Sequence, residues 1–275
     1  MRIDAHHHFW QYNAAEYGWI SDQMALLRRD YMPDDLLVEL SQCNIDGTVV
    51  VQARQTEAET RWLLSLAREN PFIKGVVGWV DLRAPDLEAR LNEYKKEVWL
   101  KGFRHVLEDE PDPGFMLNSD FLGGVEALAD HDFSYDLLIR PDQLPQAGEL
   151  VRKLPPMRLV VDHMAKPDIR NQGWQAWADG MACLASFDHV YCKMSGLVTE
   201  ADWQGWQPSD FEPYLDHVFQ VFGPERVMFG SDWPVCKVAG RYRAVHALAS
   251  DYVHRRYPEY EAAVLGENAM AFYRL

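Results

Sequence analysis

Eight short runs of apolar and β-branched residues alternate with helix-like segments along this chain of 275 residues, and this alternation most constrains its fold. Strand, helix and strand in succession are the pattern of parallel strands that crossover helices join. Eight such units predict a closed (β/α)8 TIM barrel of the α/β class rather than an open sheet. The predicted strands are Ile3–Ala5, Thr48–Gln52, Ile73–Val80, Leu100–Arg104, Ser134–Ile139, Arg158–Asp162, Val190–Met194 and Val227–Gly230.

The segments between these strands carry signals for the start of a helix. Pro33, Pro85 and Ser209 each precede an acidic residue and an apolar helical pattern, a combination that suits the first turn of a helix. The helices expected after them are Leu36–Cys43, Leu87–Tyr94 and Phe211–Phe222. No fixed-period repeat, low-complexity tract or Gly/Ser-rich linker interrupts the series, so we predict one domain over residues 1–275.

Composition narrows the classes of partner. The net charge of −15 repels phosphate backbones and anionic lipid heads, so we expect no nucleic-acid partner. The chain starts without the apolar core of a secretory signal, and no run of about 18 apolar residues follows, which predicts a cytoplasmic protein without membrane contact. A homo-oligomer is allowed. The four cysteines lack CxxC spacing and are expected to be reduced thiols: Cys43, Cys183, Cys192 and Cys236.

The first predicted strand carries a histidine triplet at its end. Because side chains alternate along a strand, His6 and His8 share one face and His7 points the other way. Two imidazoles that project together from the C-terminal end of a barrel strand suit a metal ion, since imidazole nitrogen is a common zinc ligand.

Strands six and eight also end in ionisable residues. His163 follows the apolar run Leu159–Val161, and Asp232 follows Val227–Phe229. The C-terminal ends of barrel strands are where active sites lie, so we expect His163 as a ligand, acid or electrophile and Asp232 as the general base. A lone strand-terminal Asp is often only a helix N-cap, but His6, His8, His163 and Asp232 together predict a catalytic site.

Four motifs along the chain carry a resemblance to a known family. They are Ile3-Asp4-Ala5-His6-His7-His8, Val161-Asp162-His163, Phe229-Gly230-Ser231-Asp232-Trp233-Pro234 and Asn268-Ala269-Met270-Ala271-Phe272-Tyr273. Together they resemble the amidohydrolase superfamily, and within it the amidohydrolase-2 branch that contains sugar lactonases of the L-fuconolactonase and L-rhamnonolactonase type. This resemblance spans the chain and implies hydrolysis of a small-molecule sugar lactone.

The resemblance also bears on metal binding. Many members of the superfamily bridge two metals with a lysine, glutamate or histidine on strand five, whereas strand five here reads Phe133–Ile139 without one. The resemblance therefore implies one divalent ion, such as zinc, on His6, His8 and Asp232, with His163 as a further candidate. Some relatives of this branch work without metal, so the ion is allowed rather than required.

Strands four and seven supply candidates to polarise a lactone carbonyl. Arg104 and His105 must point to opposite faces of strand four, and of the two we favour His105 for the inward position and a catalytic role. Arg104 and Lys193 are expected to bind substrate.

Three long loops follow strands one, four and seven and are candidate lids: Trp10–Met32, Val106–Asn118 and Leu197–Pro208. Tryptophans in or near the strand-end loops offer flat faces for sugar C–H groups, although packing is the commoner role of any single one. They are Trp10, Trp19, Trp203, Trp206 and Trp233, and we expect Trp10 and Trp233 to contact the substrate.

Two alternatives stay open. A metal-dependent decarboxylase of an unsaturated or aromatic acid is the nearest, since a fold does not fix function. Such an enzyme must anchor a carboxylate, for which Arg54, Arg104 and Arg140 are available. The other is a non-catalytic sugar-binding barrel, against which the intact histidine and aspartate set argues.

Overall fold

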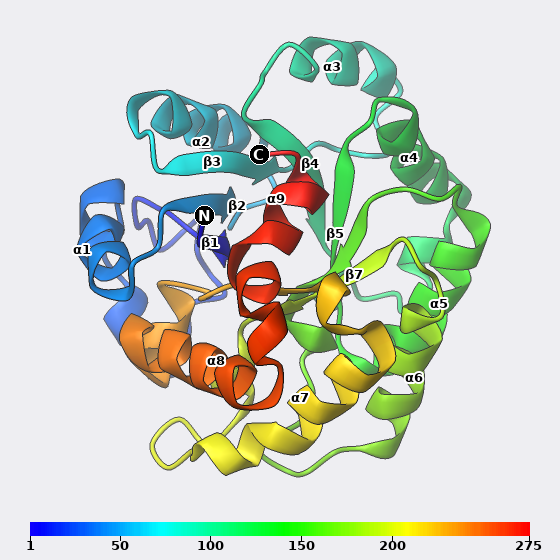
Figure 1. The fold of residues 1–275 in the computed structure, drawn as a ribbon. Helices are drawn as coiled ribbons and strands as arrows, with labels where there is room; N and C mark the ends of the chain where they lie inside the picture. Colours follow the sequence, from blue (N-terminus) through cyan, green and yellow to red (C-terminus); the bar gives the residue numbers. More distant parts are fainter.

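Eight parallel strands form one sheet in sequence order in the computed structural model, which describes residues 1–275 (Figure 1). The sheet closes where Asp232 N donates to His6 O at 2.8 Å and His8 N donates to Trp233 O at 2.7 Å. The predicted (β/α)8 TIM barrel with a single domain is confirmed. The strands are β1 (Ile3–His7), β2 (Gly47–Val51), β3 (Ile73–Gly78), β4 (Leu100–Val106), β5 (Ser134–Leu138), β6 (Leu159–Val161), β7 (Val190–Met194) and β8 (Val227–Phe229).

Eight helices surround the barrel, and a ninth lies in front of its centre in Figure 1, near both chain ends. The helices are α1 (Pro33–Cys43), α2 (Glu57–Glu69), α3 (Leu87–Tyr94), α4 (Ser119–Asp130), α5 (Leu144–Lys153), α6 (Gln175–Ala185), α7 (Pro208–Phe222), α8 (Tyr242–Arg256) and α9 (Asn268–Tyr273). The three predicted helix starts at Pro33, Pro85 and Ser209 lie within two residues of the first residues of α1, α3 and α7. None of these helices combines the length and apolar character that crossing a bilayer requires.

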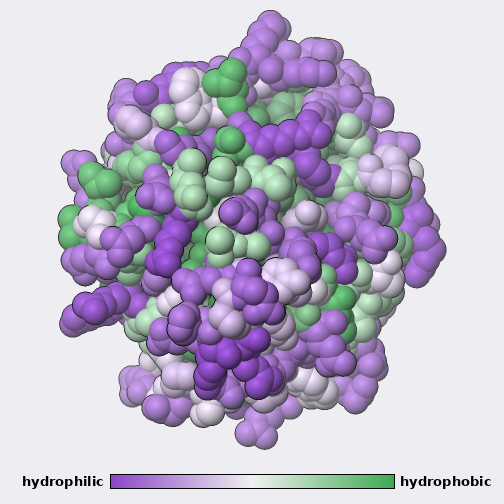
Figure 2. Space-filling view, viewed as in Figure 1, coloured by the Kyte–Doolittle hydropathy of each residue, from purple (hydrophilic) through white to green (hydrophobic).

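Apolar side chains fill one end of the barrel. Residues from five strands and from α9 form a separate buried cluster of Ile3, Ala5, Val49, Val51, Val77, Val160, Met228, Ala269, Phe272 and Tyr273. Figure 2, drawn from the same side as Figure 1, shows mostly hydrophilic residues over this end, with small scattered hydrophobic patches. Because α9 covers the N-terminal ends of the strands, space for a ligand lies at their C-terminal ends.

A bulge in β1 turns His6 toward the barrel interior. Asp4 points outward and accepts a hydrogen bond from Tyr242 Oη of α8 at 3.0 Å, while Ala5 packs in the interior cluster. The pairing of β1 with β2 shifts register between Asp4 and His7, so Ala5 and His6 both face inward. Bulges commonly re-aim side chains next to active sites. Gly230 leaves room for His6, since a Cβ atom there would lie 2.6 Å from His6 Cβ.

Candidate active site

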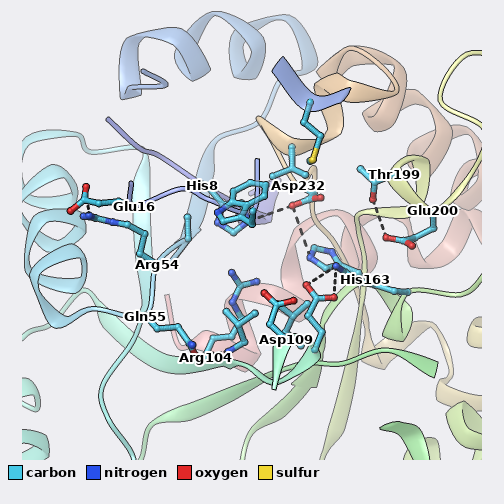
Figure 3. Close-up of a pocket in the computed structure, with 18 of the residues that line it drawn as sticks. His8, Glu16, Arg54, Gln55, Arg104, Asp109, His163, Thr199, Glu200 and Asp232 are labelled. Atoms are coloured by element: carbon cyan, nitrogen blue, oxygen red, sulfur yellow. Dashed lines mark hydrogen bonds and ion pairs between the residues drawn. The ribbon is translucent and has the colours of Figure 1, made fainter. Parts of the chain in front are cut away.

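A cavity of about 580 Å³ opens at the C-terminal ends of the strands (Figure 3). His8, Arg104, His163 and Asp232 line it from β1, β4, β6 and β8, or from the residues that directly follow these strands. All three loops that were predicted as lids contribute to the cavity wall. The loop after β1 adds Glu16, Trp19 and Met24, the loop after β4 adds Val106, Glu108 and Asp109, and the loop after β7 adds Thr199, Glu200 and Trp203. The loop after β2, which was not singled out as a lid, adds Arg54 and Gln55.

The four residues that the sequence placed at the centre of the site lie together in the structure. His6 Nε2 and His8 Nε2 are 3.3 Å apart, and His8 Nε2 lies 3.4 Å from Asp232 Oδ1. The Nε2 atoms of His6 and His163 each lie 4.0 Å from the same carboxylate oxygen. Figure 3 shows Asp232 between His8 and His163. All four side chains are buried, so their contacts are shielded from bulk water.

The donor set fits a divalent ion. His8 Nδ1 lies 2.8 Å from the carbonyl oxygen of Val51, which can only accept a hydrogen bond, so in the neutral ring Nδ1 carries the proton. The lone pair of His8 Nε2 then faces the Asp232 carboxylate, and two facing acceptors favour a cation or a proton between them. Ligands of a tetrahedral zinc ion lie about 3.3 Å apart, close to the spacing within His6, His8 and Asp232.

His6 also sits between two protein cations. Arg104 Nη1 lies 3.3 Å from His6 Nε2, and Lys193 Nζ lies 3.1 Å from His6 Nδ1. Lys193 further pairs with Asp136 at 2.5 Å and Asp162 at 3.1 Å, is fully buried, and does not line the cavity. The expectation that Lys193 binds substrate is therefore corrected, because its ammonium group lies beneath the site and supports His6.

Arg104, and not His105, faces the cavity. Arg104 Nη1 contacts Asp162 Oδ2 at 3.1 Å, and Arg104 Nη2 donates to Gln52 O at 2.5 Å. His105 lies outside the cavity, where its ring stacks on Phe115 and its Nε2 is 2.7 Å from a Glu110 oxygen. The preference for an inward, catalytic His105 was therefore wrong. Strand alternation allowed only one inward residue, and the buried Asp162 carboxylate draws the guanidinium inward.

The tryptophan expectations also need correction. Trp10 is buried away from the cavity and donates from Nε1 to Arg29 O at 2.9 Å, which ties the loop after β1 to the barrel. Trp233 packs edge-on against Tyr31 and is buried as well. Neither lines the cavity, whereas Trp19 and Trp203 do. Trp206 does not line the cavity either, and its Nε1 donates to Ala239 O at 2.8 Å.

The surroundings set the protonation of the central groups. Burial lowers the pKa of His163 to about 4, so its imidazole is neutral at pH 7. Burial alone would raise the pKa of Asp232, but the surrounding groups, with His163 the largest contributor and Lys166 among them, outweigh it and hold that pKa below its usual range. Asp232 is therefore an ionised carboxylate at pH 7, as a general base requires, and the His163 imidazole beside it is neutral.

Sequence reasoning missed several charged groups in the cavity wall. They are Lys166, which follows β6, and the loop residues Glu108 and Glu200. Which loop side chains turn inward depends on loop conformation, and periodicity does not predict that conformation. The spacing of three residues between His163 and Lys166 is the signal that points to Lys166, because a single tight turn brings such residues to one side.

Comparison with known proteins gives the family. A family model described as Amidohydrolase matches residues 3–275. An L-fucono-1,5-lactonase of Burkholderia multivorans is 42% identical over 286 residues, which cover 100% of this chain and 96% of that protein. Another L-fucono-1,5-lactonase, from Burkholderia ambifaria, is 37% identical over 281 residues, which cover 100% of this chain and 96% of that protein.

A solved structure agrees with this family. The crystal structure of an amidohydrolase from Burkholderia multivorans with bound zinc has a TM-score of 0.96 and 41% identity, and covers 100% of this chain and 99% of that one. The resemblance in the strand-end motifs is thus confirmed. This chain is an enzyme that belongs to the amidohydrolase family.

Proposed function

We propose that this chain hydrolyses a neutral sugar lactone, an aldonolactone such as L-fucono-1,5-lactone, to the sugar acid. The observation that carries this proposal is the buried Asp232 carboxylate, which lies 3.4 Å from His8 Nε2 and beside the His6 and His163 imidazoles in the cavity at the strand ends. The names of the two Burkholderia lactonases support the substrate class.

In the proposed mechanism Asp232 acts first as a base. Its carboxylate takes a proton from water while the water oxygen attacks the lactone carbonyl carbon. The carbonyl oxygen gains negative charge, which Arg104 in the cavity wall stabilises together with an N–H of neutral His163. The tetrahedral intermediate then breaks its bond to the ring oxygen. Asp232 returns the proton to that oxygen, and the product is an open-chain hydroxy acid.

A metal ion is compatible with this scheme. His6, His8 and Asp232 would hold a divalent ion, which when bound supplies Lewis acidity next to the carbonyl. Arg104 Nη1 lies 3.3 Å from His6 Nε2, the nitrogen that would bind the ion, so this chain places a cationic side chain beside the metal position. We propose that zinc assists catalysis without being indispensable.

The charge of the cavity favours a neutral substrate over an acid. Five carboxylates line it against three cations: Glu16, Glu108, Asp109, Glu200 and Asp232 against Arg54, Arg104 and Lys166. A decarboxylase must anchor a carboxylate, for which two inward arginines are expected, yet Arg54 pairs with Glu16 at 2.7 Å, which leaves Arg104 alone. Arg140 does not line the cavity. The same negative charge aids release of the anionic product.

A substrate panel tests the proposal. Purified protein, with and without chelator treatment, is offered neutral aldonolactones, a carboxylated lactone and 2,6-dihydroxybenzoate. Acid release is followed with an indicator in weak buffer, and carbon dioxide release is followed separately. We expect acid release from neutral aldonolactones that survives chelation at a reduced rate. Carbon dioxide from the aromatic acid without lactone hydrolysis would establish the decarboxylase instead.

A further inference from the structure

Four consecutive residues after β6 have a left-handed backbone, although none is glycine. The φ angles of His163, Met164, Ala165 and Lys166 are 53°, 52°, 54° and 50°. A left-handed backbone is sterically unfavourable for L-residues, and it persists mainly where the surrounding structure fixes it, as at functional sites.

Packing fixes this turn firmly. Met164 and Ala165 are fully buried, and Trp177 Nε1 donates to Met164 O at 2.7 Å. Lys166 N closes the turn by donating to His163 O at 2.8 Å. The two ends of the turn, His163 and Lys166, both line the cavity, while the two residues between them do not. The turn therefore delivers a second polar side chain to the cavity beside a central histidine.

Lys166 pairs with a carboxylate of one other loop, and a carboxylate of a third loop lines the same cavity. Its Nζ lies 2.7 Å and 2.6 Å from the two oxygens of Glu108, in the short helix Leu107–Asp109 after β4. Glu200 ends the short helix Leu197–Glu200 after β7 and lines the same cavity. Burial alone would lower the pKa of Lys166, but Glu108 and Glu200 raise it, so the ammonium group stays charged. Its contact with Glu108 does not exhaust its three N–H donors.

We propose that Lys166, Glu108 and Glu200 form a subsite that recognises the ring hydroxyls of the substrate. The ammonium group donates to hydroxyl oxygens, and the carboxylates accept hydroxyl hydrogens, which gives charge-assisted hydrogen bonds. A cavity built to pair hydroxyls rejects an analogue without them, because its buried charges lose their partners. This inference rests on the proposed function, since the polyol is taken to be a lactone.

The test separates recognition from chemistry. Two probes are used. L-fucono-1,5-lactam is a non-hydrolysable polyol whose binding is measured by calorimetry. δ-Valerolactone is a six-membered lactone without hydroxyls, and its hydrolysis measures the chemical step alone. Lys166→Met and Glu108→Gln are compared with Lys166→Arg, which keeps the charge, and with Lys153→Met, which removes an exposed lysine on α5. Circular dichroism and melting temperature check that each variant folds.

We expect Lys166→Met and Glu108→Gln to weaken lactam binding by about 10–100-fold, the loss of one or two charge-assisted hydrogen bonds. KM for L-fucono-1,5-lactone should rise similarly, while kcat/KM for δ-valerolactone changes by less than about threefold. Lys166→Arg should keep part of the affinity, and Lys153→Met all of it.

Other outcomes separate the two proposals. Unchanged lactam binding in Lys166→Met and Glu108→Gln, or no lactam binding to the wild type, would overturn the subsite. An equal loss of rate on both lactones would also overturn it. Lactam binding that these variants weaken, in a protein that hydrolyses neither lactone, would support the subsite and refute the hydrolase.

Discussion

Glu59 is a buried carboxyl that orders the loop after β2. Its Oε2 accepts from the backbone N–H groups of Ala53 at 2.9 Å and Arg54 at 2.7 Å, and the side chain is fully buried. Burial raises the pKa of Glu59 to about 7. Arg54 and its neighbours in this loop line the cavity, so Glu59 acts on the site by positioning them.

This pKa predicts how stability depends on pH. Between about pH 4.5 and 7 the folded protein binds a proton at Glu59 that the unfolded chain has released, so the free energy of unfolding falls as pH rises through this window. Glu59→Gln replaces the titrating carboxyl with an amide. It therefore removes this pH-dependent part of the free energy of unfolding, which amounts to at most about 3 kcal/mol. We expect a smaller drop in the urea midpoint between pH 5 and pH 8 in Glu59→Gln than in the wild type. Equal drops would contradict this role.

At the residue scale the sequence predicts which residues lie in the site, but it does not always predict which side chains face the cavity. Strand-end position predicted that His6, His8, His163 and Asp232 lie together, although the inward orientation of His6 also depends on the bulge in β1. Alternation could not decide between Arg104 and His105, because that choice depends on the buried Asp162 that pairs with the guanidinium group. Partners that are distant in the sequence are invisible to a local pattern.

At the scale of elements, apolar periodicity predicted every strand with ends within two residues of those observed. It did not predict the bulge in β1 or the left-handed turn His163–Lys166. Neither departure carries a glycine within the affected residues to mark it. Tertiary contacts impose both, such as the hydrogen bond from Trp177 to Met164.

The left-handed turn leads to a prediction about Ala165. Ala→Gly in a right-handed helix costs about 1 kcal/mol because glycine loses more backbone freedom on folding. At Ala165, with φ at 54°, the same change also removes the steric cost of the left-handed backbone. Ala165→Gly should therefore be about 1–2 kcal/mol less destabilising than Ala178→Gly, its buried control in α6. Denaturant unfolding measures both, and equal losses would refute the strain.

At the scale of the molecule, α9 completes the barrel by closing the end opposite the cavity. Phe272 packs against Tyr191 of β7 with ring centroids 5.0 Å apart, and Tyr273 Oη donates to the interior Asp136 at 2.7 Å. The sequence identified Phe272 and Tyr273 as part of a C-terminal motif. It did not predict that they pack in the interior cluster, because this packing requires α9 to lie across the N-terminal ends of the strands.

Removing the ring of Phe272 tests this closure. Phe272→Ala should lower the free energy of unfolding by about 3–5 kcal/mol, because it leaves a cavity in the interior cluster. Leu37→Ala on α1 is the control, since this leucine is exposed and should cost about 0.5 kcal/mol or less. Urea unfolding of the two variants measures the difference, and similar losses would show that α9 does not hold the barrel.

The role of Asp232 as the general base of a lactonase is tested most directly by comparing the wild type with Asp232→Asn on L-fucono-1,5-lactone. The measurement is the initial rate of lactone loss above the uncatalysed rate, with melting temperatures as the check on folding. We expect rapid hydrolysis by the wild type and a loss of about 10²–10⁴-fold in the folded variant, the usual effect of removing a general base. Hydrolysis at the wild-type rate by Asp232→Asn would contradict this role of Asp232.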